Sequence, residues 1–574
     1  MTSDEVRKRF LAFFEKRGHT GVPSSSLVPE NDTSVLFTTA GMQQFKPYYT
    51  GEKKAQNDFG SKNTMSIQKC IRTSDIDEVG DATHLTFFEM LGNFSFGGYG
   101  RKEAIIYAHD FITKELGLDI SYVTFYRGNE NVPRDDESRK MWQELGVADI
   151  REDGADVFWG PTGDSGPCGP TTEIYCKNAD GKDVEIWNIV FNEYMCNGSR
   201  EMLDKGQAKL IKLFVPGIDT GMGFERLVAT IQKKKSVYDT DLFTPILKKI
   251  DDLAVFQQTQ DFVQGRRVIA DHIRASVFMI ADGVISSNTD RGYVLRRLIR
   301  MAIRYTDALV IKEGGLAEVA DAVIEHYGNS YPELHTHAEK IKKEINDEEK
   351  KFKKSIKEGL PLIGKEDPFI LYTSYGIPFE MTKSILYIQK KPLPDLEDFK
   401  LKMKKHQEIS RAGAEQKFKG GMGDTSEISV RYHTATHLLH QALRDVLGKE
   451  VQQRGSNITP ERLRFDFSFP RKMTDEEKKK VEDIVNEKIR EALPMQKVVL
   501  PKAEAEKTGA LHFFGDKYGD HVNVYFIGKT LDTAYSKEFC GGPHVTNTKE
   551  LGTFKIQKEE AVSAGVRRIK AVLV

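Results

Sequence analysis

The chain has 574 residues, of which 39% are hydrophobic and 29% are charged, which is typical of globular domains with adequate cores and excludes a disordered chain. The formal net charge of -1 excludes an overall positive field, so any nucleic acid must be bound by a local basic patch. The five scattered cysteines predict a reducing compartment, and no apolar run has the length of a membrane span or signal peptide, so we expect a cytoplasmic protein without membrane contact.

The first predicted domain, residues 1–235, has mixed secondary structure. Short runs of β-forming residues alternate with glycine-rich turns, which predicts an antiparallel sheet with flanking helices. The glycine cluster at 159–170 would let backbone approach a ligand closely, but it lacks the spacing of a phosphate loop or a dinucleotide-binding turn and could be only a loop. Trp159 beside this cluster and Asn188 inside an apolar run predict the wall and the polar handle of a small-molecule pocket.

Asp219 and Arg226 lie at the two ends of a segment that changes from a turn into helical periodicity. The carboxylate would suit an ammonium group, and the guanidinium would suit a phosphate or an adenine face. An intramolecular ion pair at the start of the helix is the alternative that the spacing leaves open.

The second predicted domain, residues 236–420, is helical and highly charged. Arg296, Arg300 and Arg304 recur every four residues, so they would lie on one helix face and suit the phosphates of a nucleic-acid stem. A solvated helix face is the alternative, and it is our prediction for the lysine- and glutamate-rich run at 340–357.

The third predicted domain, residues 421–574, alternates helical and strand-like runs and is predicted to be α+β. His433 and His437 would lie side by side on a helix, whereas Cys540 and His544 flank Gly-Gly-Pro, which must form a turn. Three imidazoles and one thiolate favour zinc. The alternative is that these are ordinary helix histidines and a buried cysteine.

Several of these stretches, in this order along essentially the whole chain, resemble those of alanyl-tRNA synthetases. They are Arg72, residues 86–96, 185–191 and 219–226, and the two ligand pairs of the third domain. The resemblance implies an α+β multidomain protein with a class II synthetase antiparallel-sheet catalytic domain, a helical tRNA-recognition domain and an α+β zinc-containing editing domain. It implies formation of alanyl-adenylate from ATP and L-alanine, transfer of alanine to tRNA(Ala), and hydrolysis of Ser- and Gly-tRNA(Ala).

The same resemblance assigns roles to single residues of the first domain. The implied catalytic residues are Arg72, Asp219 and Arg226. ATP would be bound with Mg²⁺ by Arg72, Phe88, Glu89 and Arg226, with adenine between Phe88 and Arg226. L-alanine would be bound by Met42, Trp159, Asn188, Val190, Asp219 and Gly221.

Roles in tRNA binding and editing follow in the same way. The implied tRNA-binding residues are Asn288, Asp290, Arg291, Arg296, Arg300 and Arg304. Thr436 and Gln453 would line the editing pocket, and zinc would be held by His433, His437, Cys540 and His544. Four protein ligands would close a structural site and three would leave room for water, so either role of zinc stays open.

The sequence departs from the family pattern in three places. The loop between Arg72 and Val79 is short and lacks a lysine that would contact phosphate, so Lys69, or Mg²⁺ with the two arginines, would have to compensate. Thr373 stands where the family has an aspartate that reads a G·U pair. The small barrel before the editing domain and the C-terminal domain of many relatives are missing, so we expect a monomer.

Two rival functions remain open from the sequence. One is a zinc-dependent deacylase of mischarged tRNA with an inactive synthetase half, which the missing lysine motivates. The other is an RNA-binding scaffold with structural zinc.

Overall fold

The computed structural model describes residues 1–29, 35–74, 76–154, 157–161, 165–255, 260–288, 290–405, 427–459, 461–511, 521–563 and 565–573. Tertiary contacts divide the chain into two compact units, residues 1–358 and 359–574. The predicted boundary at residue 420 lies outside the described residues. The division of the chain into three domains therefore remains a prediction.

The first unit is built on a nine-stranded sheet with the order β1-β2-β3-β9-β8-β7-β4-β5, in which β6 pairs with β7. Neighbouring strands are antiparallel except for the pairs β1–β2 and β4–β5, which confirms the predicted antiparallel sheet. The strands are β1 Thr20–Gly21, β2 Asn63–Ile71, β3 Phe87–Ser95, β4 Ile120–Tyr126, β5 Ile150–Asp153, β6 Phe158–Trp159, β7 Gly166–Lys177, β8 Asp183–Cys196 and β9 Leu210–Gly223.

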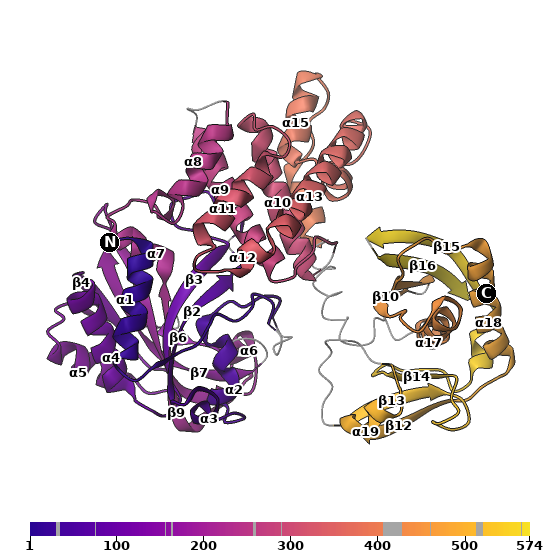
Figure 1. The fold of residues 1–574 in the computed structure, drawn as a ribbon, viewed down its shortest axis with the longest axis horizontal. Coiled ribbons are helices and arrows are strands. Elements are labelled where there is room, and N and C mark those ends of the chain that lie inside the picture. Colours follow the sequence, from indigo (N-terminus) through magenta and orange to yellow (C-terminus); the bar gives the residue numbers. More distant parts are fainter. Residues whose placement is uncertain are drawn as a thin grey trace. The chain divides into compact units, whose positions relative to one another are not determined.

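Successive side chains of each strand point to opposite faces of this sheet. On the core face, Trp187 lies 6.3 Å from the ring of Phe14 and 5.7 Å from that of Phe111. These two rings belong to α1 (Ser3–Glu15) and to the helical turn Phe111–Glu115 that follows α4 (Arg101–Asp110), and Figure 1 shows α1 and α4 beside the sheet. The opposite face, called the polar face below, carries Gln68, Phe88, Glu173, Asn188 and Asp219.

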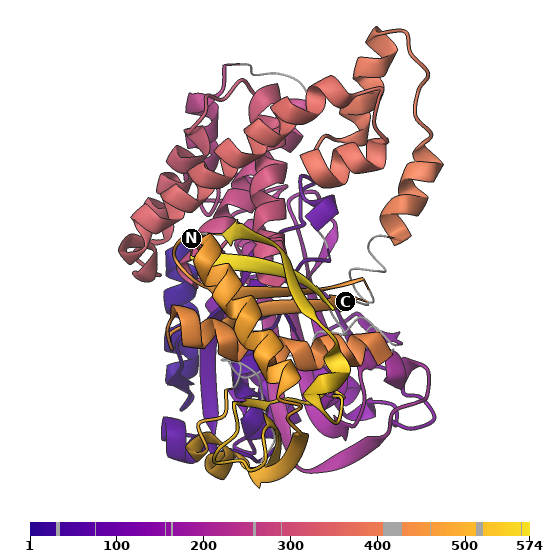
Figure 2. The same cartoon turned by 90° about the vertical axis from the view of Figure 1, so that its right-hand side faces the viewer.

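One group of helices of the first unit gathers at one end of the sheet (Figures 1 and 2). They are α8 Thr244–Leu253, α9 Gln260–Ala281, α10 Asp290–Ala308, α11 Gly315–Tyr327, α12 Glu333–Thr336 and α13 Ala338–Gly359. Their buried side chains join those of the sheet in one hydrophobic core, which extends in sequence from Val6 to Phe352. Shorter helices are α2 Lys46–Tyr49, α3 Ala55–Phe59, α5 Asp136–Glu144, α6 Arg200–Asp204 and α7 Phe224–Ile231.

Helix α13 includes the run at 340–357 that was predicted to be a solvated helix, and one of its faces is buried. Ile341, Ile345 and Phe352 are completely buried, and Glu348 is buried beside them. One face of this charged helix is therefore part of the core, because its few apolar residues keep helical spacing.

The second unit begins with helices around a small core that includes Leu371 and Ile377. They include α14 Pro368–Ile370 and α15 Phe379–Ile388. After them, α17 (Glu427–Leu447) and α18 (Asp475–Arg490) share a core with a four-stranded antiparallel sheet in the order β10-β11-β16-β15.

The second unit also contains a three-stranded sheet in the order β12-β13-β14 and the short helix α19 Lys502–Lys507. The strands of the two sheets are β10 Gln453–Thr459, β11 Arg462–Ser468, β12 Met495–Pro501, β13 His521–Ile527, β14 Ser536–Phe539, β15 Phe554–Ser563 and β16 Val566–Leu573. The predicted α+β architecture of this part is confirmed.

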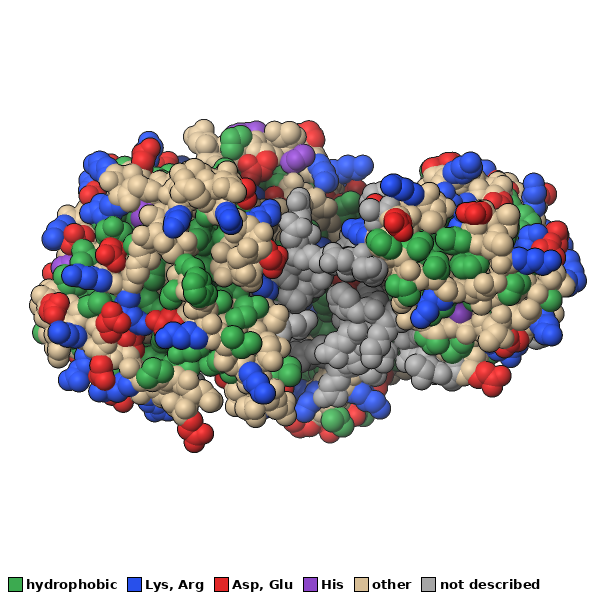
Figure 3. Space-filling model, turned by 90° about the horizontal axis from the view of Figure 1, so that it is seen from below, with side chains coloured by type: hydrophobic (Ala, Val, Ile, Leu, Met, Phe, Trp, Pro, Cys, Tyr) green, Lys and Arg blue, Asp and Glu red, His purple; other side chains and the backbone are tan. Residues whose placement is uncertain are grey.

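The surface shows no long-range separation of charge on the face drawn in Figure 3, where acidic and basic side chains are interspersed. None of the helices in the described ranges is both long and apolar enough to cross a bilayer.

Candidate active site and candidate metal centre

The strand register brings the predicted alanine-binding residues of β8 and β9 together on the polar face. Val190 pairs with Asp219, and Asn188 pairs with Gly221. Directly opposed residues of an antiparallel pair share a face, so these four positions form one compact patch. The patch joins segments that are about thirty residues apart in sequence, which the alternation within a single strand cannot reveal.

Asp219 is the acidic group of this patch. It is 5% exposed, and burial raises the pKa of its carboxyl to about 8. Desolvation disfavours the charged form of a carboxyl group, and a nearby cation would reverse that effect. The site is therefore suited to bind a small cation such as an ammonium group.

Asn188 provides a polar group that is fixed on one side only. Its Nδ2 donates to Glu173 Oε1 at 2.9 Å, whereas its Oδ1 is buried and has no hydrogen-bond partner among the described residues. Burial and the charge of Glu185 raise the pKa of Glu173 to about 7. Glu173 was missed in the sequence, although its position opposite Asn188 on β7 makes it the group that orients the amide.

Two further predicted alanine-binding residues, Met42 and Trp159, come from distant segments. Met42, in the 3-10 turn Gly41–Phe45, is completely buried and shares a cluster with Phe94 and the partly buried Trp159. A Cβ atom at Gly221 would lie 2.9 Å from Met90 Sδ, so the Met90 side chain already occupies the space beside this glycine and would have to shift for any larger residue. Residues 162–164 of the glycine cluster lie outside the described residues.

Arg72, Phe88 and Arg226 lie beside the patch, where β2 ends, β3 begins and β9 leads into α7. The guanidinium of Arg72 lies 4.9 Å from the ring centre of Phe88. Arg226 is 43% exposed, and its Nη1 lies 3.3 Å from Glu185 Oε2. Arg226 thus pairs with Glu185, and the alternative ion pair with Asp219 is not formed.

Two residues that we expected near ATP lie on the core face. The Glu89 carboxylate is completely buried and accepts hydrogen bonds from Arg7 Nη2 at 2.5 Å and from the Tyr331 hydroxyl at 2.7 Å. Lys69 Nζ lies 3.0 Å from both Asp282 Oδ1 and Glu333 Oε1. We therefore remove Glu89 from the ATP-binding set, and Lys69 cannot replace the missing loop lysine.

The arginine row of α10 has an acidic partner. Arg296 Nε donates to Glu348 Oε1 at 3.1 Å, and Arg300 Nε donates to the same oxygen at 2.6 Å. Arg296 also donates to Asn288 Oδ1, which brings these two predicted tRNA-binding residues together. The row is thus partly engaged with α13, so its full charge is not presented to solvent. Local spacing cannot reveal this pairing, because Glu348 lies 48 residues beyond Arg300.

The other predicted tRNA-binding residues, Asp290, Arg291 and Arg304, also belong to α10. Asp290 begins the helix with φ 54°, and Arg291 Nε donates to the Leu36 carbonyl at 2.5 Å. Arg304 lies half-buried on the same helix. Thr373 belongs to the second unit, and its hydroxyl donates to the Phe369 carbonyl at 2.8 Å.

The second unit brings the four predicted metal ligands together. One ligand atom of each of His433, His437, Cys540 and His544 lies within 4.8 Å of all the others. Cys540 Sγ is 3.4 Å from both His433 Nε2 and His544 Nε2. His433 Nδ1 lies 3.0 Å from the Pro543 carbonyl oxygen, which leaves its Nε2 directed to the cluster. Helix α17 and the turn after β14 thus supply two ligands each.

The donor set fits a soft divalent cation. Burial lowers the pKa of His433 to about 4 and that of His544 well below the usual value, so both imidazoles are neutral, as ligation requires. Burial raises the pKa of the Cys540 thiol to about 12, and a bound cation would be needed to stabilise the thiolate. His437 Nδ1 is buried without a hydrogen-bond partner among the described residues. These features agree with three nitrogen ligands and one sulfur ligand.

The predicted editing residues and two further polar side chains lie in the same part of the second unit. His440, one turn after His437, lies outside the cluster, and its Nδ1 is 3.0 Å from Glu538 Oε1. The Thr436 hydroxyl donates to the Tyr432 carbonyl at 2.9 Å. Gln453 is half-buried at the start of β10. Glu538, which was missed in the sequence, also lies 3.7 Å from His437 Nε2.

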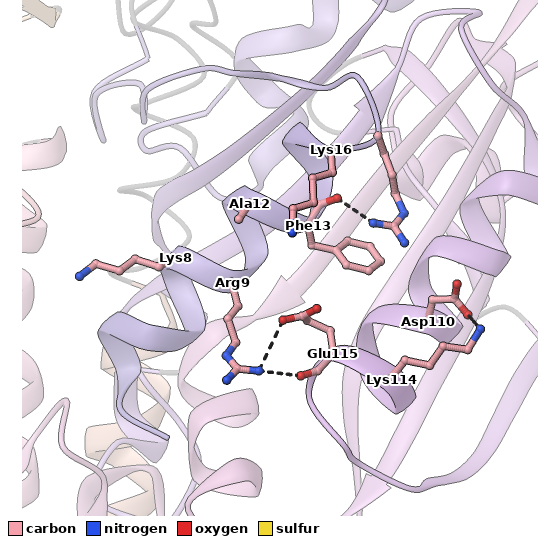
Figure 4. A pocket seen from close by; sticks show the side chains of 9 residues that line it. Lys8, Arg9, Ala12, Phe13, Lys16, Asp110, Lys114 and Glu115 are labelled. Atoms are coloured by element: carbon pink, nitrogen blue, oxygen red, sulfur yellow. Dashed lines mark hydrogen bonds and ion pairs between the residues drawn. The ribbon is translucent and has the colours of Figure 1, made fainter.

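Two surface cavities lie away from these residues. The one in Figure 4, about 500 Å³, lies between α1 and the turn after α4, where Arg9 donates to the Glu115 carbonyl at 3.0 Å. The other, about 460 Å³, includes Arg444 and Lys537 in the second unit. Neither contains a predicted site residue.

The fold and the polar face define a class II tRNA synthetase. Residues 5–456 match the family profile described as "tRNA synthetases class II (A)", and residues 522–570 match "Threonyl and Alanyl tRNA synthetase second additional domain".

Comparison with individual proteins shows which class II synthetases the chain is similar to. The chain is 46% identical over 612 residues to an alanine–tRNA ligase of Treponema denticola, covering 100% of this chain and 99% of the relative. It is 44% identical to that of Borrelia hermsii, covering 100% of both chains, and 36% identical to that of Dehalococcoides mccartyi, covering 100% of this chain and 80% of the relative. The chain belongs to the alanine–tRNA ligase family.

Proposed function

We propose that the protein is an alanine–tRNA ligase that activates L-alanine with ATP, transfers it to tRNA(Ala) and hydrolyses Ser- and Gly-tRNA(Ala). The observation that carries this proposal is the register of β8 and β9, which sets Asp219, Asn188 and Gly221 side by side on the polar face. The end-to-end similarity to alanine–tRNA ligases supports the same function.

Activation begins with alanine held by its ammonium group. The Asp219 carboxylate binds the ammonium group, and the free Oδ1 of Asn188 accepts a second hydrogen bond from it. The methyl group faces Met42 and Trp159. This orientation leaves the alanine carboxylate free to attack the α-phosphate of ATP, with pyrophosphate as the leaving group.

ATP lies next to the alanine, where β3 begins and β9 leads into α7. Adenine lies between Phe88 and Arg226, and Arg72 neutralises charge that develops on the α-phosphate. Because Lys69 is held in the core by Asp282 and Glu333, we assign no role to it. Mg²⁺ bound with ATP would neutralise the other phosphates.

The tRNA then supplies the hydroxyl that attacks the carbonyl carbon of alanyl-adenylate, and AMP leaves. We propose that Asn288, Asp290 and Arg291, at the start of α10, contact the acceptor stem. Arg296, Arg300 and Arg304 would add phosphate contacts, although Glu348 reduces the charge that the first two present.

A second site, which hydrolyses mischarged tRNA, is needed because alanine is too small to be distinguished reliably from glycine and serine. One methylene group is worth only about 1 kcal/mol, and an apolar pocket rejects an added hydroxyl poorly, so glycine and serine will be activated at times. We propose that zinc held by His433, His437, Cys540 and His544 organises the correcting site. When bound there, zinc would fix the ligand geometry and, with an open position, polarise water. Thr436 and Gln453 would line the pocket.

The experiment compares two variants of the full-length protein. Arg72→Ala should reduce alanine-dependent ATP–pyrophosphate exchange at least about a hundredfold and leave deacylation of Ser-tRNA(Ala) within about twofold, because the two residues belong to different units. Cys540→Ala should do the reverse. If either substitution impaired both activities equally, the two-site assignment would be wrong.

The absence of a loop lysine favours one second candidate, a deacylase with an inactive synthetase half. Wild-type protein would then deacylate Ser-tRNA(Ala) but show no alanine-dependent exchange. Measurable exchange with alanine excludes this candidate.

A further inference from the structure

Three residues of helix α9 contact Thr86 and Phe87, where β3 begins. Asp271 Oδ1 accepts a hydrogen bond from the Thr86 amide at 3.0 Å, and Arg274 Nη2 donates to the Phe87 carbonyl. The ring of Phe278 stacks on that of Phe87 at 4.1 Å and an interplanar angle of 9°. Residues three and four apart share one helix face, so α9 presents a continuous surface to the segment that leads into Phe88.

Arg274 also reaches the start of α7. Its Nη1 donates to Glu225 Oε1 at 3.0 Å, and the Glu225 carboxylate accepts from the Glu89 amide at 3.2 and 3.3 Å. Arg274 is completely buried, and Glu225 is 1% exposed. One buried ion pair therefore binds the backbone on both sides of Phe88.

The same ion pair includes the residue directly before Arg226. Phe88 and Arg226 come from β3 and α7, and among the described contacts the Arg274–Glu225 pair is a direct polar bridge between these two segments. The separation of the phenyl ring and the guanidinium must match the thickness of a flat base that enters between them. A small error in that separation weakens binding, because stacking depends on close contact.

We propose that Arg274 is a positioning residue of the ATP subsite, which sets the gap between Phe88 and Arg226 through Phe87 and Glu225. This inference rests on the proposed function. It makes α9, a helix of the region expected to recognise tRNA, a structural part of the adenylation site.

The geometry explains why this position requires arginine. The planar guanidinium donates in two directions, from Nη2 to the Phe87 carbonyl and from Nη1 to Glu225 and to the Tyr327 hydroxyl at 3.0 Å. A lysine has one compact donor group and can satisfy only part of this set. A methionine would leave the Glu225 carboxylate buried without its cation.

The test uses full-length R274M and R274K. R274M should raise KM for ATP in alanine-dependent exchange by about tenfold and leave KM for alanine within about twofold, because Asp219 and Asn188 do not contact this network. R274K should recover part of the loss. Deacylation of Ser-tRNA(Ala) should be unchanged, because it is assigned to the second unit.

The control for simple loss of stability is R266M. Arg266 lies on the same helix, and its Nη2 is 2.6 Å from Asp251 Oδ2, away from the polar face. R266M should lower Tm without changing KM for ATP. If R274M raised both KM values equally, or reduced only the active fraction, the role of Arg274 would be structural and the proposal would be wrong. If R274M does not fold, R274K and D271N provide the same comparison.

Calorimetric titration with ATP separates this inference from the proposed function. Wild-type protein that binds ATP but shows no alanine-dependent exchange would contradict the proposed function. Equal ATP affinity of wild-type protein and R274K, together with equal affinity of D271N, would contradict the positioning role.

Discussion

Asp219 shows how burial prepares a single residue for its ligand. Its carboxyl has a pKa of about 8, and burial is the cause. Ligand-free protein therefore holds Asp219 largely protonated at neutral pH, whereas an ammonium ligand requires the charged form. Binding of alanine must then be coupled to release of a proton.

We predict that KM for alanine depends on pH through this group. Below the Asp219 pKa of about 8, each unit of falling pH should raise KM for alanine roughly tenfold, since one pKa unit corresponds to about 1.4 kcal/mol. KM for ATP should change much less. Exchange kinetics between pH 6 and pH 8 measure both values, and a KM for alanine that stays constant over this range would contradict the assignment.

The same shift has an opposite effect on the stability of the ligand-free protein. A raised pKa means that the folded state binds the proton more tightly, so stability falls as pH rises from 3.8, the ordinary value, towards 8. Asp219→Asn should therefore raise Tm of ligand-free protein by a few degrees at pH 8 and leave it unchanged near pH 4. Glu173 and Glu225, with pKa values of about 7, affect both proteins equally, so the difference isolates Asp219.

Residues were predictable from the sequence where chemistry and local spacing agreed. The metal ligands gathered as expected, because a helix fixes the separation of His433 and His437 and the glycine turn forces the other pair into a bend. Glu89 was misplaced because it follows Phe88 in a strand, and neighbouring strand residues point to opposite faces. Strict use of that alternation would have corrected it.

At the scale of elements, the contacts between distant helices escaped prediction. The arginine row of α10 was visible as a repeat, but Glu348 belongs to α13 and meets Arg296 and Arg300 only in the folded chain. Likewise, Arg274 and Glu225 form a buried ion pair that the residues around each of them do not predict. Periodicity predicts which face of a helix is buried, and it does not say which helix covers it.

We predict that a metal ion bound by α17 stabilises the second unit. The cluster joins α17 to the turn at 540–544, so a bound metal should stabilise the second unit. Purified protein should contain about one zinc per chain, and removal by a chelator should lower the Tm of the second unit by roughly 5–10 °C without affecting the first. Elemental analysis and thermal unfolding measure both effects.

Matched variants on the same helix sharpen this test. His437→Ala should lose the zinc, whereas His440→Ala should retain it, because His440 is buried one turn away but lies outside the cluster. Equal zinc content in the two variants would show that the four residues do not form the site.

At the scale of the whole molecule, the hydrophobic core and the predicted functional domains have different boundaries. The first unit has one core from Val6 to Phe352, which crosses the predicted boundary at residue 235. Glu89 and Glu225, both of the sheet half, have their buried partners Tyr331 and Arg274 in the helices beyond that boundary. A charged group buried without its partner destabilises a fold by several kcal/mol.

We therefore predict that a fragment of residues 1–359 folds alone and a fragment of residues 1–235 does not. The longer fragment ends with α13 and keeps the complete core, so it should unfold cooperatively and catalyse alanine-dependent exchange at a rate within about threefold of the full chain. The shorter fragment would expose the Phe87 ring and leave the Glu225 carboxylate without Arg274, whereas Glu89 would lose Tyr331 but keep Arg7. Circular dichroism melts and exchange assays on both fragments measure the difference. Cooperative folding of residues 1–235 with normal KM for ATP would show that helix α9 is dispensable, and it would overturn the unit boundary and the role of Arg274 together.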